Sequence, residues 1–159
     1  MNSEQRILQE RENWRKDRPF GFVAKPQMRK DKTLDLFNWI CTIPGPEGSP
    51  FFGQDLLLKI EFLSSYPTSP PVVKFVQNVF HPNVYNDGYI CLDLLDHAWS
   101  PSLNIKTILL AVQTLLAEPN IDSPANVKAA NLYTQKPGEY NSIAIKRLSV
   151  KRKASQIGQ

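Results

Sequence analysis

The chain is poor in cysteine and histidine, with two of each among its 159 residues. A disulfide-stapled secreted domain usually has more cysteines, and these cysteines and histidines do not stand at the spacing of a zinc site. No run approaches about 18 apolar residues, so the sequence predicts no membrane-spanning helix. The first residues are polar and charged, without the apolar core of a signal peptide. We therefore expect a cytoplasmic and nuclear protein with reduced thiols, no metal, no cofactor and no membrane contact.

The composition is that of one globular domain, with 42% hydrophobic and 21% charged residues. We expect a domain over residues 1–150 and a basic tail over residues 151–159. The net charge is +4, and basic residues gather near both ends of the chain. These clusters are either solvated surfaces or docking sites for acidic partners. Nucleic acid is not an expected partner, because no aromatic residues alternate with the basic ones in the tail.

Hydrophobic periodicity predicts an α+β fold. The N-terminal helix has Ile7, Leu8, Arg11 and Trp14 near one face and ends before Pro19. The predicted strands cover Gly21–Ala24, closed by Pro26, then Leu34–Pro44, Leu56–Phe62 and Val72–Val76. An irregular segment over residues 80–102 precedes the predicted helices Ile105–Ala117, Ala125–Thr134 and Glu139–Lys151. Short turns between sequential strands predict a four-stranded antiparallel meander, and segregated helices predict α+β.

The candidate catalytic residues lie in one stretch, FHPNVYNDGYICLDLL, over residues 80–95. A His-Pro-Asn turn ends at Asn83, eight residues before Cys91, and a Trp-Ser-Pro sequence follows at residues 99–101. Cys91 is either a small core residue or a nucleophile. An amide at this offset can bond the oxygen of an acyl group carried on the sulfur. The block resembles the catalytic core of the ubiquitin-conjugating enzyme family.

The resemblance covers residues 5–150 and implies the fold already predicted from periodicity. It also implies a transferase that accepts ubiquitin, or a ubiquitin-like protein, from an activating enzyme as a thioester on Cys91. The modifier then passes to a lysine amine of a substrate protein, with the help of a ligase. A noncatalytic domain that only binds ubiquitin is the rival interpretation, and the presence of Cys91 speaks against it.

The resemblance assigns further roles around Cys91. Asn83 would donate its amide to the developing oxyanion, or alternatively would only pin the loop. Tyr85, Asp122 and Ser123 match the groove that receives the lysine, although many members have an acidic residue where Ser123 stands. A protease-like Cys–His pair is the alternative chemistry, with His97 six residues from the cysteine. His81 is interpreted as a structural residue of the turn.

Two docking surfaces are also implied by the resemblance. The activating enzyme or the modifier would bind the basic residues Arg11, Arg15, Lys16 and Arg18. The ligase would bind a surface made of Arg6, Pro46, Glu47, Thr68, Ser100, Pro101 and Ser102. Members that serve HECT ligases have phenylalanine where this chain has Thr68, so RING-type ligases are the expected partners.

Different parts of the chain resemble family members that conjugate different modifiers. The N-terminal string QERENWRKDRPFGFVAKP resembles the SUMO-conjugating member of the family, whereas the centre resembles ubiquitin-conjugating members. The SUMO enzyme has an acidic insertion after its cysteine and two basic residues around the fourth strand. Here only residues 92–98 separate Cys91 from Trp99, and Val72 replaces one of the basic residues, leaving Lys74. The sequence therefore favours ubiquitin, with SUMO as the alternative.

Overall fold

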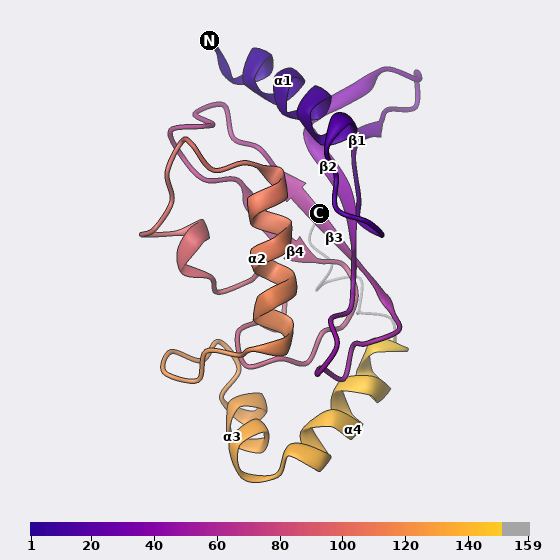
Figure 1. The fold of residues 1–159 in the computed structure, drawn as a ribbon, viewed down its shortest axis with the longest axis vertical. Helices are drawn as coiled ribbons and strands as arrows, with labels where there is room; N and C mark the ends of the chain where they lie inside the picture. The colour runs from indigo at the N-terminus through magenta and orange to yellow at the C-terminus, as the bar shows by residue number, and fades with distance from the viewer. Residues whose placement is uncertain (151–159) are drawn as a thin grey trace.

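The structure is a computed structural model that describes residues 1–150, and it confirms the predicted α+β fold (Figure 1). The predicted tail over residues 151–159 lies outside the described residues. The elements are α1 (Ser3–Lys16), β1 (Val23–Met28), β2 (Leu34–Pro44), β3 (Asp55–Glu61), β4 (Val72–Phe75), the 3-10 helix η1 (Asp93–Leu95), α2 (Ile105–Ala117), α3 (Val127–Gln135) and α4 (Pro137–Leu148). Within residues 1–150, no helix is long and apolar enough to cross a membrane.

The sheet is an antiparallel meander in the order β1-β2-β3-β4. The first strand is longer than the sequence predicted, because it continues through Pro26 to Met28. The register of β1 against β2 shifts between Pro26 and Gln27, where β2 has the extra residues 36–38. Proline is tolerated at such a place because β1 is an edge strand and the shift already interrupts the ladder.

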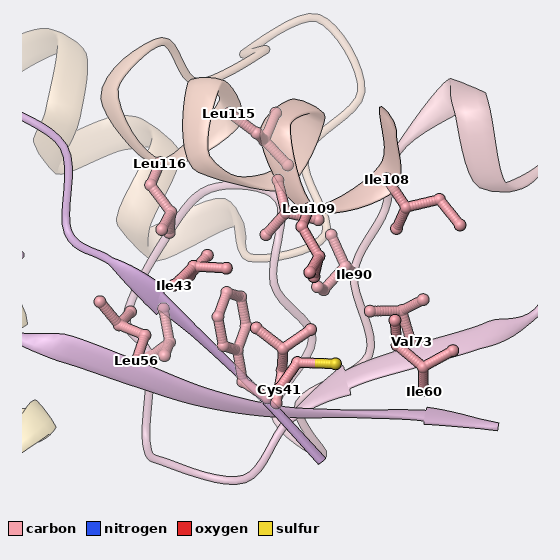
Figure 2. Packing of buried hydrophobic residues seen from close by; sticks show 14 of the residues in the cluster. Cys41, Ile43, Leu56, Ile60, Val73, Ile90, Ile108, Leu109, Leu115 and Leu116 are labelled. Atoms are coloured by element: carbon pink, nitrogen blue, oxygen red, sulfur yellow. The ribbon is translucent and has the colours of Figure 1, made fainter. Parts of the chain in front are cut away.

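The core lies between one face of the sheet and α2 (Figure 1). Strand β3 alternates buried Leu56, Leu58 and Ile60 with outward residues, as period-two patterning requires. Leu109, Leu115 and Leu116 of α2 point toward this face (Figure 2). Each fully buried Leu or Ile contributes about 1.5–3 kcal/mol, so α2 is held on the sheet by this apolar layer.

Helix α1 buries only part of the predicted face. The buried residues are Ile7, Glu10 and Trp14, whereas Leu8 is 43% exposed. Spacings of three and four residues place all three buried residues on one side of a helix. Glu10 was not among the predicted residues, and a charged residue is rarely buried without a partner. The partners of Glu10, described below, explain its position.

Candidate active site

Cys91 and Asn83 stand at the two ends of a small hairpin. The N–H of Cys91 donates to the carbonyl of Asn83 at 2.8 Å, and the turn between them is closed by Gly88 N–H donating to Tyr85 O at 2.9 Å. Gly88 has a φ of +97°, which glycine adopts without strain. The eight-residue spacing in the sequence is therefore the length of a hairpin that brings these two residues side by side.

The hairpin is attached to the edge of the sheet at β4. Phe75 N–H donates to Gly88 O at 2.9 Å, and Lys74 forms an isolated bridge with Tyr89. The ammonium of Lys74 lies 5.4 Å from the centre of the Tyr89 ring, at cation–π distance. The cysteine is thus carried by a loop that a rigid strand supports.

The two cysteines have different environments. Cys41 is fully buried in β2, and burial raises the pKa of its thiol to about 12. Cys91 is half-buried and lies within hydrogen-bonding reach of the Tyr85 hydroxyl. The charge of Cys91 is the main cause that raises the pKa of Tyr85 above its usual range. Tyr85 therefore stays a neutral hydroxyl at physiological pH and can donate toward the sulfur.

Asn83 is buried, and its side chain is bonded to the backbone of Asn120. The side-chain oxygen accepts from Asn120 N–H at 2.8 Å, and the side-chain nitrogen donates to Asn120 O at 2.7 Å. This pair matches the loop-pinning alternative. An amide nitrogen has two hydrogens, so one remains for an acyl oxygen beside Cys91. The same side chain can therefore pin the loop and donate to the substrate.

His81 is structural, as the sequence predicted. Its ring is fully buried, with Nε2 2.8 Å from Leu115 O and Nδ1 accepting from Asn83 N–H at 2.9 Å. Burial lowers its pKa to about 4, so the ring is neutral. His97 is exposed and pairs with Asp96 at 3.9 Å. Both ring nitrogens of His81 are therefore occupied within the protein, and the contact that the structure gives His97 is with an exposed carboxylate.

The loop with Asp122 and Ser123 is tied to the His-Pro-Asn turn on both sides. Asn120 holds Asn83 on one side, and the N–H groups of Ala125 and Asn126 donate to Pro82 O at 2.8 and 3.0 Å on the other. Residues 121–124 between these anchors are exposed. Both predicted groove residues therefore lie on a loop that is fastened beside Asn83.

The four basic residues predicted to bind the activating enzyme or modifier do not share one surface. Arg11 and Arg15, four residues apart, line an open groove on α1 together with Leu8. Lys16 instead lines a cavity of about 280 Å³ between α1 and the start of α2. Arg18 is exposed beyond the end of the helix. Arg11 and Arg15 form the basic face of α1, in a groove that Glu12 also lines.

Part of the predicted ligase surface is brought together around Arg6. The guanidinium of Arg6 donates to Pro101 O at 2.8 Å and to Leu103 O at 2.7 Å, which fixes the loop holding Ser100, Pro101 and Ser102. The indole of Trp99 donates to Pro67 O at 2.9 Å, which places this loop beside exposed Thr68.

Pro46 and Glu47 are not brought to this cluster. They lie in the turn between β2 and β3, whereas Thr68 lies in the connection between β3 and β4. In an antiparallel meander, successive turns lie at opposite ends of the sheet. The predicted meander already implied this separation, but the family resemblance assigned the surface without it, and the structure limits the cluster to residues near Arg6.

Glu10 is a buried residue that the sequence analysis missed. Its carboxylate accepts from Ile105 N–H at 2.8 Å, from Arg6 Nε at 3.1 Å and from the Tyr66 hydroxyl. These contacts join α1, the loop before β4 and the first turn of α2. The only sequence signal was its place between buried Ile7 and Trp14.

Comparison with known proteins agrees with this geometry. The family described as "Ubiquitin-conjugating enzyme" matches residues 6–148. The chain is 44% identical to "SUMO-conjugating enzyme UBC9" of Caenorhabditis elegans over 154 residues, which covers 96% of this chain and 92% of that protein. It is also 44% identical to "SUMO-conjugating enzyme SCE1" of Arabidopsis thaliana over 137 residues, covering 85% and 86%. The chain therefore belongs to the ubiquitin-conjugating enzyme family, transferases that carry a ubiquitin-like modifier as a cysteine thioester.

Proposed function

We propose that this chain is a SUMO-conjugating enzyme that carries the modifier on Cys91 and transfers it to a substrate lysine. The observation that carries this proposal is the 44% identity, over nearly the whole chain, to a protein described as a SUMO-conjugating enzyme. This similarity replaces ubiquitin, which the sequence motifs favoured, as the leading modifier. The expected partners are the activating enzyme, a RING-type ligase and substrate proteins.

The proposed reaction has two transfers. First, the Cys91 thiolate attacks the thioester of the charged activating enzyme, and the thiolate of that enzyme leaves. Second, the neutral amine of a substrate lysine attacks the carbonyl carbon on Cys91, the carbonyl oxygen becomes an oxyanion, and collapse expels the Cys91 thiolate. The nitrogen loses its proton to solvent, and an isopeptide bond remains.

The residues around Cys91 have distinct tasks in the second transfer. The second hydrogen of the Asn83 amide would donate to the oxyanion, a contribution of about 2.7–4 kcal/mol for one donor. Tyr85, neutral and next to the sulfur, would line the entry of the lysine side chain. Partial removal of water from the lysine lowers its pKa and favours the neutral amine.

Ubiquitin is the second candidate, and one observation favours it. The segment from Cys91 to Trp99 is short and folds as the compact helix η1 (Asp93–Leu95). It therefore lacks the acidic insertion that the family resemblance associates with the SUMO-conjugating member. Val72, at a position where that member has a basic residue, also favours ubiquitin.

Charging assays separate the two candidates. The protein is incubated with ATP and either the SUMO or the ubiquitin activating enzyme, each with its own modifier. We expect a reductant-sensitive adduct with SUMO, no adduct on Cys91→Ala, and an unchanged adduct on Cys41→Ala. Efficient charging by the ubiquitin enzyme alone would reverse the choice of modifier. Charging that persists in Cys91→Ala and disappears in Cys41→Ala would overturn the assignment of the cysteine.

A further inference from the structure

One of the three tryptophans has an indole N–H without a hydrogen-bond partner. Trp39 Nε1 donates to Leu36 O at 2.8 Å, and Trp99 Nε1 donates to Pro67 O at 2.9 Å. Trp14 is only 4% exposed, and among residues 1–150 its buried Nε1 has no acceptor. Native proteins pair nearly all buried donors, because an unpaired one costs free energy. The unpaired donor of Trp14 therefore indicates a place where a ligand can supply an acceptor.

Trp14 lines a cavity of about 280 Å³ between α1 and the start of α2, which we call the α1–α2 cavity. Its volume equals that of about nine water molecules in the liquid, which is enough for a small organic molecule. Asn13 and Lys16 of α1 line the cavity, and so do Ile105 and Lys106 of α2. The walls thus combine apolar side chains with a few polar groups, as ligand pockets do.

The charges around the α1–α2 cavity favour an anion. The two acidic residues that line it are Glu10 and Asp17. Glu10 is paired with Arg6 at 3.1 Å, and Asp17 is paired with Lys106 at 3.0 Å, so both carboxylates are already compensated. Lys16 also lines the cavity and forms no ion pair with another residue of 1–150. Its ammonium is therefore available to an anionic ligand.

The first turn of α2 adds a partial positive charge on the same side. The N–H of Ile105 is bonded to Glu10, and the N–H of Thr107 donates to Asn104 Oδ1 at 2.9 Å. The N–H of Lys106 lies between them and cannot be bonded within the helix, so it is left for a ligand. Free N–H groups and the dipole at a helix N-terminus attract anions.

We propose that the α1–α2 cavity binds a small carboxylate with an apolar body. The apolar body packs against Ile105, and the carboxylate reaches Lys16 and the N–H of Lys106. One carboxylate oxygen accepts from Trp14 Nε1. Because this nitrogen is buried, a side chain of the cavity wall has to move for the oxygen to reach it. The site goes beyond the proposed transfer reaction, which uses none of these residues at Cys91.

The indole N–H resonances test the proposal, with benzoate as the probe. Proton–nitrogen correlation spectra follow the three indole signals during a titration of the uncharged protein. We expect the Trp14 signal, assigned through its contacts to the α1 backbone, to move downfield and saturate with a Kd in the millimolar range. The signals of Trp39 and Trp99 should stay, because both N–H groups already have acceptors. A Trp14 signal that does not move at saturating benzoate would overturn the proposal.

A charge variant and a neutral probe test the anion. Lys16→Gln should weaken benzoate binding about 1.5- to 5-fold, the scale of an exposed ion pair, and added salt should shrink the difference. Lys146→Gln, an exposed change on α4, should leave the Kd unchanged. Benzamide has the same ring without the charge, so it should bind the parent more weakly and be indifferent to Lys16→Gln. Equal affinities of the parent for benzoate and benzamide would refute an anion site.

Trp14→Phe removes the indole donor and keeps an aromatic side chain. We expect the Kd for benzoate to rise about 5-fold, the scale of one hydrogen bond. An unchanged Kd in the folded variant would remove Trp14 from the site. If the variant does not fold, the indole shift of the parent and the Lys16→Gln titration decide. None of these measurements needs a modifier or an activating enzyme, so their outcome is independent of the proposed function.

Discussion

The N–H of Cys91 donates to the carbonyl of Asn83 at 2.8 Å, so the nucleophile and the proposed oxyanion donor are joined through their own backbones. Asn83 is held in turn by His81 through its N–H and by Asn120 through its side chain. The backbone N–H and C=O of Asn83 and both polar atoms of its side chain are thus hydrogen-bonded within the protein. The position of its amide relative to the Cys91 sulfur is therefore fixed before any modifier arrives.

Removing the Asn83 amide should affect the second transfer most. We expect Asn83→Ala to slow discharge of the thioester to free lysine by about 10²–10³, because one oxyanion donor is lost. Charging should decline less. Single-turnover chase assays measure both rates. Asn141→Ala, an exposed asparagine on α4, is the control and should leave both rates unchanged. Equal losses in both steps with a lower Tm would leave Asn83 with only the pinning role.

Thiol labelling should distinguish the two cysteines. Cys41 is fully buried and its thiol pKa is raised to about 12, whereas Cys91 is half-buried. The thiolate is the reactive form, so the native protein should react with one equivalent of a maleimide at neutral pH. Mass spectrometry should locate the label on Cys91 and show none on Cys91→Ser. A second rapid equivalent in the native state would contradict the burial of Cys41.

Glu10 should be important for stability. Glu10→Ala leaves the buried Ile105 N–H, the Tyr66 hydroxyl and Arg6 without their shared acceptor. Arg6 keeps its bonds to Pro101 O and Leu103 O, so the cost comes mainly from the unsatisfied Ile105 N–H and Tyr66 hydroxyl, at about 1–3 kcal/mol of unfolding free energy for each. Urea denaturation measures the loss. Glu12→Ala, an exposed position on the same helix, should change the free energy by less than about 0.5 kcal/mol.

His81 should make stability depend on pH. Its folded pKa is about 4, below the value of about 6.5 expected in the unfolded chain. The unfolded state therefore binds more protons between these values, and stability is lost as pH falls from about 6.5 toward 4. The loss attributable to His81 is up to about 3 kcal/mol. Comparison of urea unfolding at several pH values should show a smaller slope in His81→Gln, and the parent slope in His97→Gln.

The basic face of α1 should act at the charging step. Reversal of Arg11 and Arg15 to Glu should slow charging by the activating enzyme, most strongly at low ionic strength, because such charges act through the encounter rate. Discharge of preformed thioester to free lysine should be nearly unchanged. Lys30→Glu, an exposed reversal in the turn between β1 and β2, is the control. A salt-independent defect in both steps would point to misfolding.

Much of the fold could be predicted from local patterns. Both β2 and α2 have the bounds that the sequence indicated, because α2 has a clear helical apolar pattern and β2 a partly period-two pattern that ends in a turn rich in proline and glycine. Helix η1 was not predicted, since three residues in a turn-rich segment carry no periodic signal. Pro26 misled the prediction of β1 because a proline stops a central strand but is tolerated in an edge strand, here at a shift in the pairing register.

The active site, too, could be predicted from the sequence only in part. The spacing of Asn83 and Cys91 was visible in the sequence because one short hairpin contains both residues. The role of Asn120 could not be predicted from the sequence, because its backbone rather than its side chain holds Asn83. The separation of Glu47 from Thr68 follows from the meander that the sequence predicted, but the resemblance assigned both residues to one surface without using the strand order.

Helix α2 has a fixed length between two attachments. Its first residue, Ile105, donates its N–H to Glu10, and near its end Leu115 O contacts the His81 ring. Deleting one residue between them would shorten the helix by about 1.5 Å and rotate one end by about 100°, so both attachments cannot survive. The helix thus behaves as a spacer of invariant length, and insertions or deletions among family members are expected in the loops rather than between residues 105 and 115.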